Sequence, residues 1–327
     1  MNPVVSIIIP AYNSERTIER CVQSAITQSF EDIEVVVIDD GSTDNTLAIL
    51  RNLESLEKRL KVISQPNQGV SVARNKGLEI AKGRFVTFVD SDDCLGSEYI
   101  NEFFIQDIPI DTLSIQIPSK RTDGQGLDSA DSSFHDRSYH ETSIFDASRE
   151  LRLLHNGYAH GKIYEREIIV EHGIRFNPAI QYKEDVLFLL DYLRYVKRIR
   201  ISNGREYYYI QHPESLSTKW KDPAVVVKIN ELIELRLKEI PFDKKEIEDF
   251  RKFCFQEVIY LIYTSKSTGI FTVYKYLKLL RESSASKSLP ITMKPDRILN
   301  FLFHNKLFVS FHLCKKILNH ILKLRFK

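Results

Sequence analysis

The sequence predicts an α/β fold, with helices flanking a mostly parallel sheet in its first part and a mainly helical C-terminal extension. Short apolar runs alternate with helical patterns over the first hundred residues, and the segments between them are short. This order indicates parallel strands joined by right-handed crossovers. Beyond Pro223, apolar residues recur at helical spacing, which predicts the extension.

Four strands are predicted from apolar runs that end in polar residues. Residues 4–9 (VVSIII) form a β-branched run, typical of a strand buried on both faces. The runs at 33–38, 60–63 and 85–89 predict the next three strands.

Between these strands, apolar residues spaced by three and four positions predict helices. Ser14 is the expected N-cap of the first helix, a second covers residues 46–57, and a third covers 71–82 and is closed by Gly83. Later in the chain we expect helices over 148–164, 184–196, 225–239 and 244–263, and a hairpin around the Asn-Gly pair within 199–210.

Length, charge and cysteine content narrow the class of protein. The 327 residues favour two domains, or one domain with a long extension, and we expect these parts to span 1–220 (with halves 1–105 and 106–220) and 221–327. A net charge of +2 does not indicate a nucleic-acid partner. The four cysteines are far apart and form no CxxC spacing, which argues against a disulfide framework or a zinc site.

The same sequence predicts a cytoplasmic protein. Its N-terminus lacks the basic segment of a signal peptide. No stretch approaches the roughly 20 apolar residues that a membrane-spanning helix needs.

Unusual polar residues follow three of the four predicted strands. They lie at 11–13, 39–42 and 90–93. Because ligands of open parallel sheets bind beyond the carboxyl ends of the strands, we expect these segments to face one crevice. This pattern favours a Rossmann-like, nucleotide-binding half.

The segment DSDD, at residues 90–93, places three carboxylates within four residues. Asp90 and Asp92 lie on the same side of an extended chain, since side chains alternate with a period of two. Mn²⁺ or Mg²⁺ takes one or two carboxylates together with substrate phosphates, so this pair is a candidate metal site. The alternative is that Asp93 or Ser97 caps a following helix, although one cap needs one acid.

Tyr12 and Asp40 indicate how a base could be bound. An aromatic ring at a strand end offers a platform for a base, worth about 1–3 kcal/mol. A nearby carboxylate can accept the N3–H of uracil. Taken singly, a tyrosine at the rim and a turn-forming Asp-Gly pair are the alternatives.

Four motifs together resemble the N-terminal half of family 2 glycosyltransferases with the GT-A fold. They are VSIIIPAYN, VVVIDDGSTD, NQGVSVARNKGLEIAKG and FVDSDD, and the match runs from Val4 to about Leu95. A weaker similarity follows at GKIYER and YKED, so the resemblance covers roughly residues 4–220. It implies a GT-A domain with a nucleotide-binding half (1–105) and an acceptor-side half (106–220).

The resemblance also implies a role for each matching residue. Asp40 would accept a hydrogen bond from the base. Asp92 would hold Mn²⁺ or Mg²⁺ against the diphosphate, and Asp90 would reach the ribose. Asp185, with Glu184 beside it, would be the catalytic base. The other residues of the implied nucleotide pocket are Pro10, Ala11, Tyr12, Asn13, Asp39, Ser42, Arg74 and Ser91.

The implied reaction is the inverting transfer of a sugar from a nucleotide sugar, expected to be UDP-linked, to a hydroxyl of a glycan or lipid-linked acceptor. Surface polysaccharide synthesis is the expected setting. Asp185 would take the acceptor proton, and the metal would neutralise charge on the departing nucleoside diphosphate. For Asp185 alone, an acid favoured by the helix dipole is the alternative. The chain departs from the family pattern at Gly161 and over 210–217, where His212, Ser215 or the nearby Lys219 could contact phosphate.

Residues 301–327 contain six Lys or Arg residues and no acid. Their spacing predicts a basic amphipathic helix. It could lie peripherally on the inner face of the cell membrane, each basic residue adding about 1 kcal/mol, or pack on protein, including a second copy of the chain.

Two other functions fit parts of the pattern. A sugar nucleotidyltransferase would need a Gly-rich loop with a basic residue after the first strand, and PAYN at 10–13 offers neither. A catalytically silent nucleotide-binding or scaffolding protein would have no need of both Asp90-x-Asp92 and Glu184-Asp185.

Overall fold

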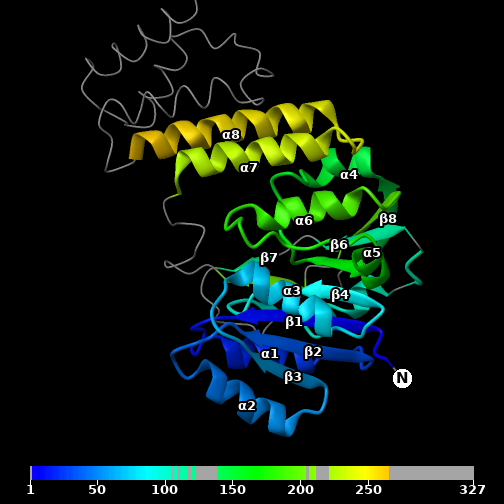
Figure 1. Cartoon of the computed structure of the whole chain (residues 1–327). Coiled ribbons are helices and arrows are strands. Elements are labelled where there is room, and N and C mark those ends of the chain that lie inside the picture. The colour runs from blue at the N-terminus through cyan, green and yellow to red at the C-terminus, as the bar shows by residue number, and fades with distance from the viewer. Residues whose placement is uncertain are drawn as a thin grey trace, which may run out of the picture.

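The computed structural model describes residues 2–104, 106–109, 111–116, 119–121, 138–203, 206–210 and 221–264. An eight-stranded sheet, in the order β3-β2-β1-β4-β9-β6-β10-β8, runs through the centre with helices on both sides (Figure 1). The predicted α/β fold with a helical C-terminal part is confirmed for these residues.

The first half of the sheet consists of four parallel strands, and every residue of β1 is buried. On β1, Ile7 and Ile9 belong to the core under α1 and α2, whereas Ile8 belongs to the core that includes Leu78 of α3. Burial on both faces explains the unbroken apolar run. The elements are β1 (Val5–Ala11), α1 (Ile18–Ile26), β2 (Ile33–Asp39), α2 (Thr46–Leu56), β3 (Leu60–Ser64), α3 (Val70–Ile80) and β4 (Phe85–Phe88).

Two details of the predicted helix ends are wrong. Thr17, not Ser14, precedes the first residue of α1, and the Ser14 carbonyl accepts from the backbone nitrogens of Thr17 and Ile18. Gly83 does not close α3, whose C-cap is Ala81. A Cβ at Gly83 would lie 2.6 Å from the backbone nitrogen of Ser6, so glycine is required there by the close approach to β1.

The second half of the sheet is mixed. Strand β9 is antiparallel to both of its neighbours, β4 and β6, while β10 is parallel to β6 and β8 is antiparallel to β10. A small second sheet has the order β5-β11-β7. The elements are β5 (Cys94–Leu95), the 3₁₀ turn Asn101–Phe103, β6 (Thr112–Gln116), β7 (Ser119–Arg121), β8 (Tyr139–Ser143), α4 (Ile144–Leu151), β9 (Lys162–Glu165), α5 (Arg166–Glu171), α6 (Glu184–Leu193), β10 (Arg198–Ser202) and β11 (Tyr207–Ile210).

Two predictions for this half are wrong. The helix predicted over 148–164 ends as α4 at Leu151, where Arg152 adopts left-handed backbone angles (φ 49°), and the chain then enters β9. The predicted hairpin within 199–210 does not form either. Strand β10 pairs with β6 and β8, whereas β11 pairs with β5 and β7, so long-range pairing outweighs the local turn signal.

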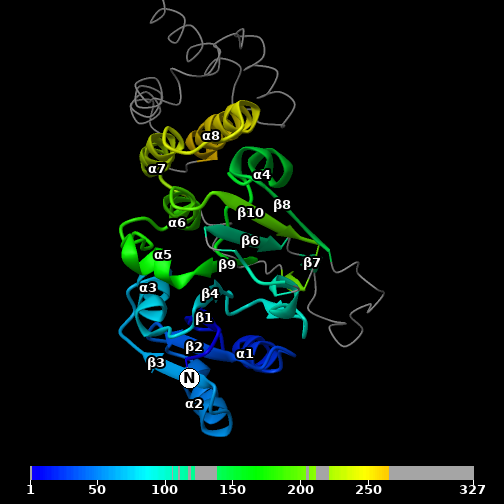
Figure 2. The ribbon, with the colours of Figure 1, turned by 90° about the vertical axis from the view of Figure 1, so that its right-hand side faces the viewer.

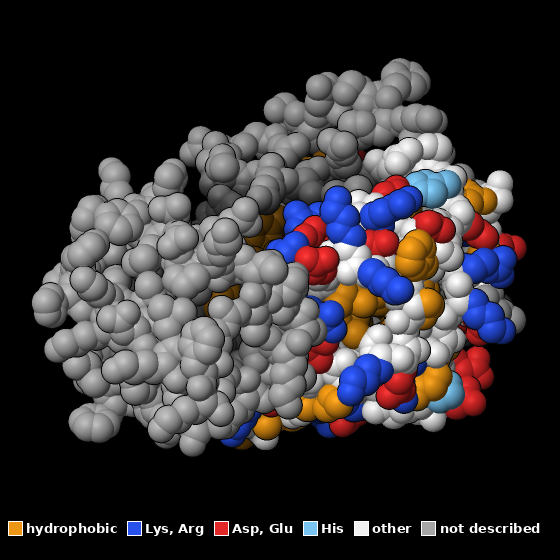
Figure 3. All heavy atoms as spheres, turned by 90° about the horizontal axis from the view of Figure 1, so that it is seen from above, with side chains coloured by type: hydrophobic (Ala, Val, Ile, Leu, Met, Phe, Trp, Pro, Cys, Tyr) orange, Lys and Arg blue, Asp and Glu red, His pale blue; other side chains and the backbone are white. Residues whose placement is uncertain are grey.

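Two long helices, α7 (Pro223–Leu237) and α8 (Lys244–Thr264), complete the described chain. Helix α7 packs on α6, and α8 packs on α7 and α4 (Figures 1 and 2). Asp222 caps α7 by accepting from the Ala224 nitrogen at 2.8 Å, with Pro223 at the first helical position. Seen from the side of α7 and α8, the described surface mixes basic, acidic and scattered hydrophobic side chains (Figure 3).

None of the described helices is both long enough and apolar enough to cross a bilayer. The basic helix predicted over 301–327 lies outside the described residues, as do His212, Ser215 and Lys219.

Candidate functional site

The loops after β1 and β2 are joined by side-chain hydrogen bonds at the carboxyl ends of the strands. The backbone nitrogen of Asn13 donates to Oγ of Ser42 at 3.0 Å, and Asn13 Oδ1 accepts from the Thr43 nitrogen at 2.8 Å. Asn13 itself has a left-handed backbone (φ 49°), which asparagine tolerates well. Farther along, Oγ of Ser14 lies 2.8 Å from Oγ of Ser91. The three strand ends therefore converge, as the sequence predicts.

Asp39 and Asp40, at the end of β2, are both buried and already hydrogen-bonded. Asp39 accepts from the hydroxyl of Ser64 and from the nitrogen of Ser42, at 2.8 and 3.3 Å. Asp40 accepts from the side chain of Gln65 and from the backbone nitrogens of Gln68 and Gly69, at 2.7 to 3.0 Å. Asp40 thus shapes the loop that leads into α3, and its contact with a base stays a prediction.

Pro10 and Ala11 complete β1, and Tyr12 follows them with 49% of its surface exposed. An exposed ring beside converging strand ends is available for stacking. The platform role of Tyr12 stays a prediction.

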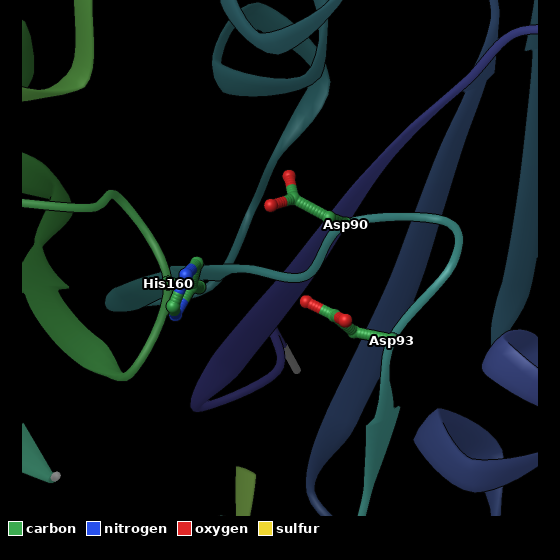
Figure 4. A group of neighbouring side chains, drawn as sticks. All are labelled: Asp90, Asp93 and His160. Atoms are coloured by element: carbon green, nitrogen blue, oxygen red, sulfur yellow. The ribbon is translucent and has the colours of Figure 1, made fainter. Parts of the chain in front are cut away.

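Asp90, Asp93 and His160 form a compact group beyond β4. One ligand atom from each lies within 4.8 Å of the others, and both carboxylates face the space beside the imidazole ring (Figure 4). Asp93 accepts from the Tyr207 hydroxyl at 2.6 Å and from the Ile210 nitrogen at 2.9 Å. Asp93 therefore ties this group to β11.

Burial shapes the ionisation of this group. Burial lowers the pKa of His160 to about 3, so its imidazole is neutral at physiological pH. Burial and the nearby Asp90 raise the pKa of Asp93 to about 8. Burial alone would raise the pKa of Asp90, but the Arg74 guanidinium outweighs it and holds that pKa below its usual value.

Arg74 connects this group to the acids that begin α6. The Arg74 side chain is 6% exposed, and its terminal nitrogens lie 2.9 Å from Oδ1 of Asp90 and 3.2 Å from Oε1 of Glu184. Burial on its own would lower the pKa of Arg74. Asp90, Glu184 and Asp185 raise this pKa by more than burial lowers it, so the guanidinium stays charged. Acids that are 94 residues apart in the chain are thus held in one electrostatic cluster.

Asp185 lies beside Glu184 at the start of α6, within this cluster. Burial and the neighbouring Glu184 raise the pKa of Asp185 to about 7, against the opposing effect of Arg74. A carboxylate with a pKa near neutrality is suited to accept a proton from a substrate hydroxyl.

The segment 156–162 borders Asp185. A Cβ at Gly157 would lie 3.3 Å from Cα of Val186, so this segment packs directly on the first turn of α6. The buried ammonium of Lys162 donates to the carbonyl oxygens of Asn156, Tyr158 and His160 at 2.6 to 3.4 Å. The ring of Tyr158 stacks on His160 at 5.0 Å and remains 48% exposed.

The residues present fit a divalent cation. Nδ1 of His160 is buried and has no hydrogen-bond partner within the described chain, and two carboxylates face the same space. Two carboxylates and one imidazole suit Mn²⁺. Asp92 is not a member of this group, so its role as a metal ligand stays a prediction, while Asp90 is common to both sets.

His160 and Asp93 were not predicted as site residues. In the sequence Asp93 reads as a helix cap, and His160 is a single histidine just before GKIYER, far from the DSDD segment. The position of His160 directly before that motif is the signal that could have identified it.

A family model for "Glycosyl transferase family 2" matches residues 6–170. A curated protein, the "Uncharacterized glycosyltransferase EpsJ" of Bacillus subtilis (strain 168), is 30% identical over 238 residues, which span 69% of this chain and 66% of EpsJ. The aligned part is thus just under two thirds of that relative.

Solved structures share the fold. S. aureus TarS 1-349 in complex with UDP superposes with a TM-score of 0.66 at 23% identity, over 94% of this chain and 88% of TarS 1-349. The mannosyltransferase PcManGT from Pyrobaculum calidifontis, in complex with GDP-Man and Mn²⁺, gives a TM-score of 0.53 at 16% identity, over 98% and 86% of the two chains.

The fold and the converging strand ends define an α/β protein of the GT-A type. The family model matches half of the length of this chain, which therefore belongs to glycosyltransferase family 2.

Proposed function

We propose that this protein is an inverting, metal-dependent glycosyltransferase. It would move a sugar from a UDP-sugar to a hydroxyl of a glycan or lipid-linked acceptor in surface polysaccharide synthesis. The observation that carries the proposal is the ion-paired cluster in which Arg74 links Asp90 with Glu184. It brings the acids after β4, on the donor side, beside the acids that begin α6, on the acceptor side.

The geometry supports a separate task for each side of the cluster. Asp185, with a pKa raised to about 7, would take the proton of the acceptor hydroxyl as it attacks the anomeric carbon. Glu184 is held by Arg74 and would keep the first turn of α6 in place. A single displacement of this kind inverts the anomeric carbon and needs no covalent intermediate.

A divalent cation held by Asp90 with Asp93 and His160, or by Asp90 with Asp92, would offset charge on the departing diphosphate. The Mn²⁺ in the PcManGT structure and the UDP in the TarS structure support these choices of cofactor and donor. Tyr12, Asn13, Asp39, Asp40 and Ser42 would line the nucleoside pocket.

We also propose the division into a transferase domain over 1–220 and a helical region over 221–327. The contacts of α7 and α8 with α4 and α6 support packing of residues 223–264 on the rest of the described chain.

The first test is thermal stability in UDP, GDP, CMP and ADP, each with and without Mn²⁺. A ligand that binds only the folded state, at 100 times its Kd, adds about 2.7 kcal/mol. We expect stabilisation by UDP that requires Mn²⁺ and is lost in Asp92→Ala or His160→Ala. Stronger stabilisation by another nucleotide would indicate a donor that carries that nucleotide instead of UDP. No response to any of the four would favour a catalytically silent protein.

A further inference from the structure

Lys183 directly precedes Glu184 and Asp185, and its buried side chain contacts α7 and α8. The side chain is 7% exposed, and Nζ lies 2.9 Å from Oε2 of Glu257 on α8. The same ammonium donates to Oδ1 of Asn230 on α7 at 3.1 Å. A lysine with a long, flexible stem is thus held from both helices at once.

Aromatic rings complete the pocket around this ammonium. Nζ lies 5.1 to 5.6 Å from the ring centroids of Tyr182, Phe250 and Phe253, distances at which a cation is attracted to a ring face. The hydroxyl of Tyr182 donates to Glu257 as well. Both residues before the Glu184–Asp185 pair are therefore bound to the same carboxylate of α8.

The backbone at Lys183 is strained. Its φ of 57° and ψ of 23° lie in the left-handed region, which is unfavourable for a residue with a side chain. Lys183 is also the N-cap of α6, and it makes no side-chain cap bond there. The direction in which the first turn of α6 leaves this residue depends on an unfavourable conformation, which persists only if the surroundings hold it.

We propose that Lys183 is a positioning residue, held by α7 and α8, that fixes the turn presenting Glu184 and Asp185 to the reacting groups. This inference rests on the proposed function of Asp185. It assigns a role in catalysis to the C-terminal helices, although neither helix contributes a residue to the acid cluster around Arg74. The ammonium acts only through the backbone that follows it.

The test compares Lys183→Met with Arg251→Met in the full-length protein. Arg251 on α8 and Glu234 on α7 form a partly buried ion pair, with both contacts at 2.6 Å, and neither residue adjoins the start of α6. The control therefore removes an ion pair of α8, as Lys183→Met does, without changing the turn before α6. Activity is followed as UDP release from the UDP-sugar that gives the highest rate with wild-type protein.

We expect Lys183→Met to lower kcat by about 10- to 100-fold, because small displacements of a catalytic group have effects of this size. The donor KM should stay within about threefold, since the nucleotide pocket is on the other side of the cluster. Glu257→Gln keeps the shape of the side chain and removes its charge. We expect it, too, to lower kcat and leave the donor KM unchanged. Arg251→Met should keep kcat within about threefold of wild type.

A second readout does not depend on the substrate. Amide hydrogen exchange should be faster at residues 184–188 in Lys183→Met and Glu257→Gln than in Arg251→Met, with UDP and Mn²⁺ binding retained. Equal kcat losses in Lys183→Met and Arg251→Met, or unchanged exchange at 184–188, would overturn the inference. If wild-type protein released no nucleoside diphosphate from any nucleotide sugar, the proposed function would fail, and the exchange comparison alone would decide the role of Lys183. If Lys183→Met did not fold, Glu257→Gln would carry both readouts.

Discussion

The guanidinium of Arg74 donates to Oε1 of Glu184 across 3.2 Å, although 110 positions separate the two residues in the chain. Its second terminal nitrogen lies 2.9 Å from Oδ1 of Asp90. One buried cation therefore balances acids from two distant segments, and removing it leaves several carboxylates facing one another.

Replacing this cation should destabilise the fold. We expect Arg74→Met to lower the free energy of unfolding by about 3 kcal/mol, because breaking a buried ion pair leaves uncompensated charge. Urea denaturation at pH 7.5 would measure it. Lys76→Met is the matched control, since Lys76 lies on the same helix and pairs with the exposed Glu79. The control should lose about 0.5 kcal/mol or less, and equal losses would contradict a structural role for the Arg74 pairs.

Catalysis should depend on the ionisation of Asp185. A general base must be ionised, so kcat/KM should rise about tenfold per pH unit below the pKa of about 7 and level off above it. Asp185→Asn should lower kcat by about 10²- to 10⁴-fold, and its kcat/KM should no longer rise with pH below 7. Asp191→Asn, on the same helix but paired with Arg236, should keep the wild-type profile. A wild-type rate that does not change between pH 5.5 and 7.5 would exclude Asp185 as the titrating base.

The metal site can be assigned by comparing ligands. In the presence of UDP, His160→Ala should weaken Mn²⁺ binding at least about tenfold, because a neutral, buried imidazole with a free nitrogen is lost. The electron paramagnetic resonance signal of free Mn²⁺ reports binding directly. His172→Ala, an exposed histidine stacked on Tyr195, is the control. If only Asp90→Asn and Asp92→Asn weakened binding, the ligand pair predicted from the sequence would replace the group around His160.

We expect Tyr158 to contact the acceptor. Its ring is exposed, rests on His160 and lies close to Asp185, whose charge raises the pKa of the phenol along with burial. Burying about 50 Å² of apolar ring and sugar surface contributes about 1.3 kcal/mol, roughly tenfold in affinity. Tyr158→Ala should therefore raise the acceptor KM about tenfold and leave the donor KM unchanged, while Tyr158→Phe should resemble wild type. A rise in donor KM alone would place Tyr158 on the nucleotide side instead.

The parallel half of the fold could be predicted because local pattern and tertiary structure agree there. The apolar runs of β1, β2 and β4 are buried on both faces, and β1, β2 and β3 are each followed by a helix that packs on the sheet. The polar strand ends converge because parallel strands present their carboxyl ends at one edge.

The second half could not be predicted to the same extent, since its strands are defined by partners far away in the sequence. Strand β9 is four residues long and exists because β4 and β6 pair with it on both sides. His160 lies just before the GKIYER motif, which is the one local signal for it. Its place beside Asp90 and Asp93 depends on the pairing of β9 with β4, which the local sequence does not indicate.

The position of β9 also constrains how the protein can move. Its residues pair with Phe85 and Val86 on one side and with Ser114 and Ile115 on the other, so the parallel half and the mixed half form one continuous sheet. A clamshell opening between the two halves would have to break the backbone hydrogen bonds of the buried strand β9 with β4 or with β6. We therefore expect substrates to enter and leave by rearrangement of the loops at the sheet edge, with the sheet itself acting as a rigid base.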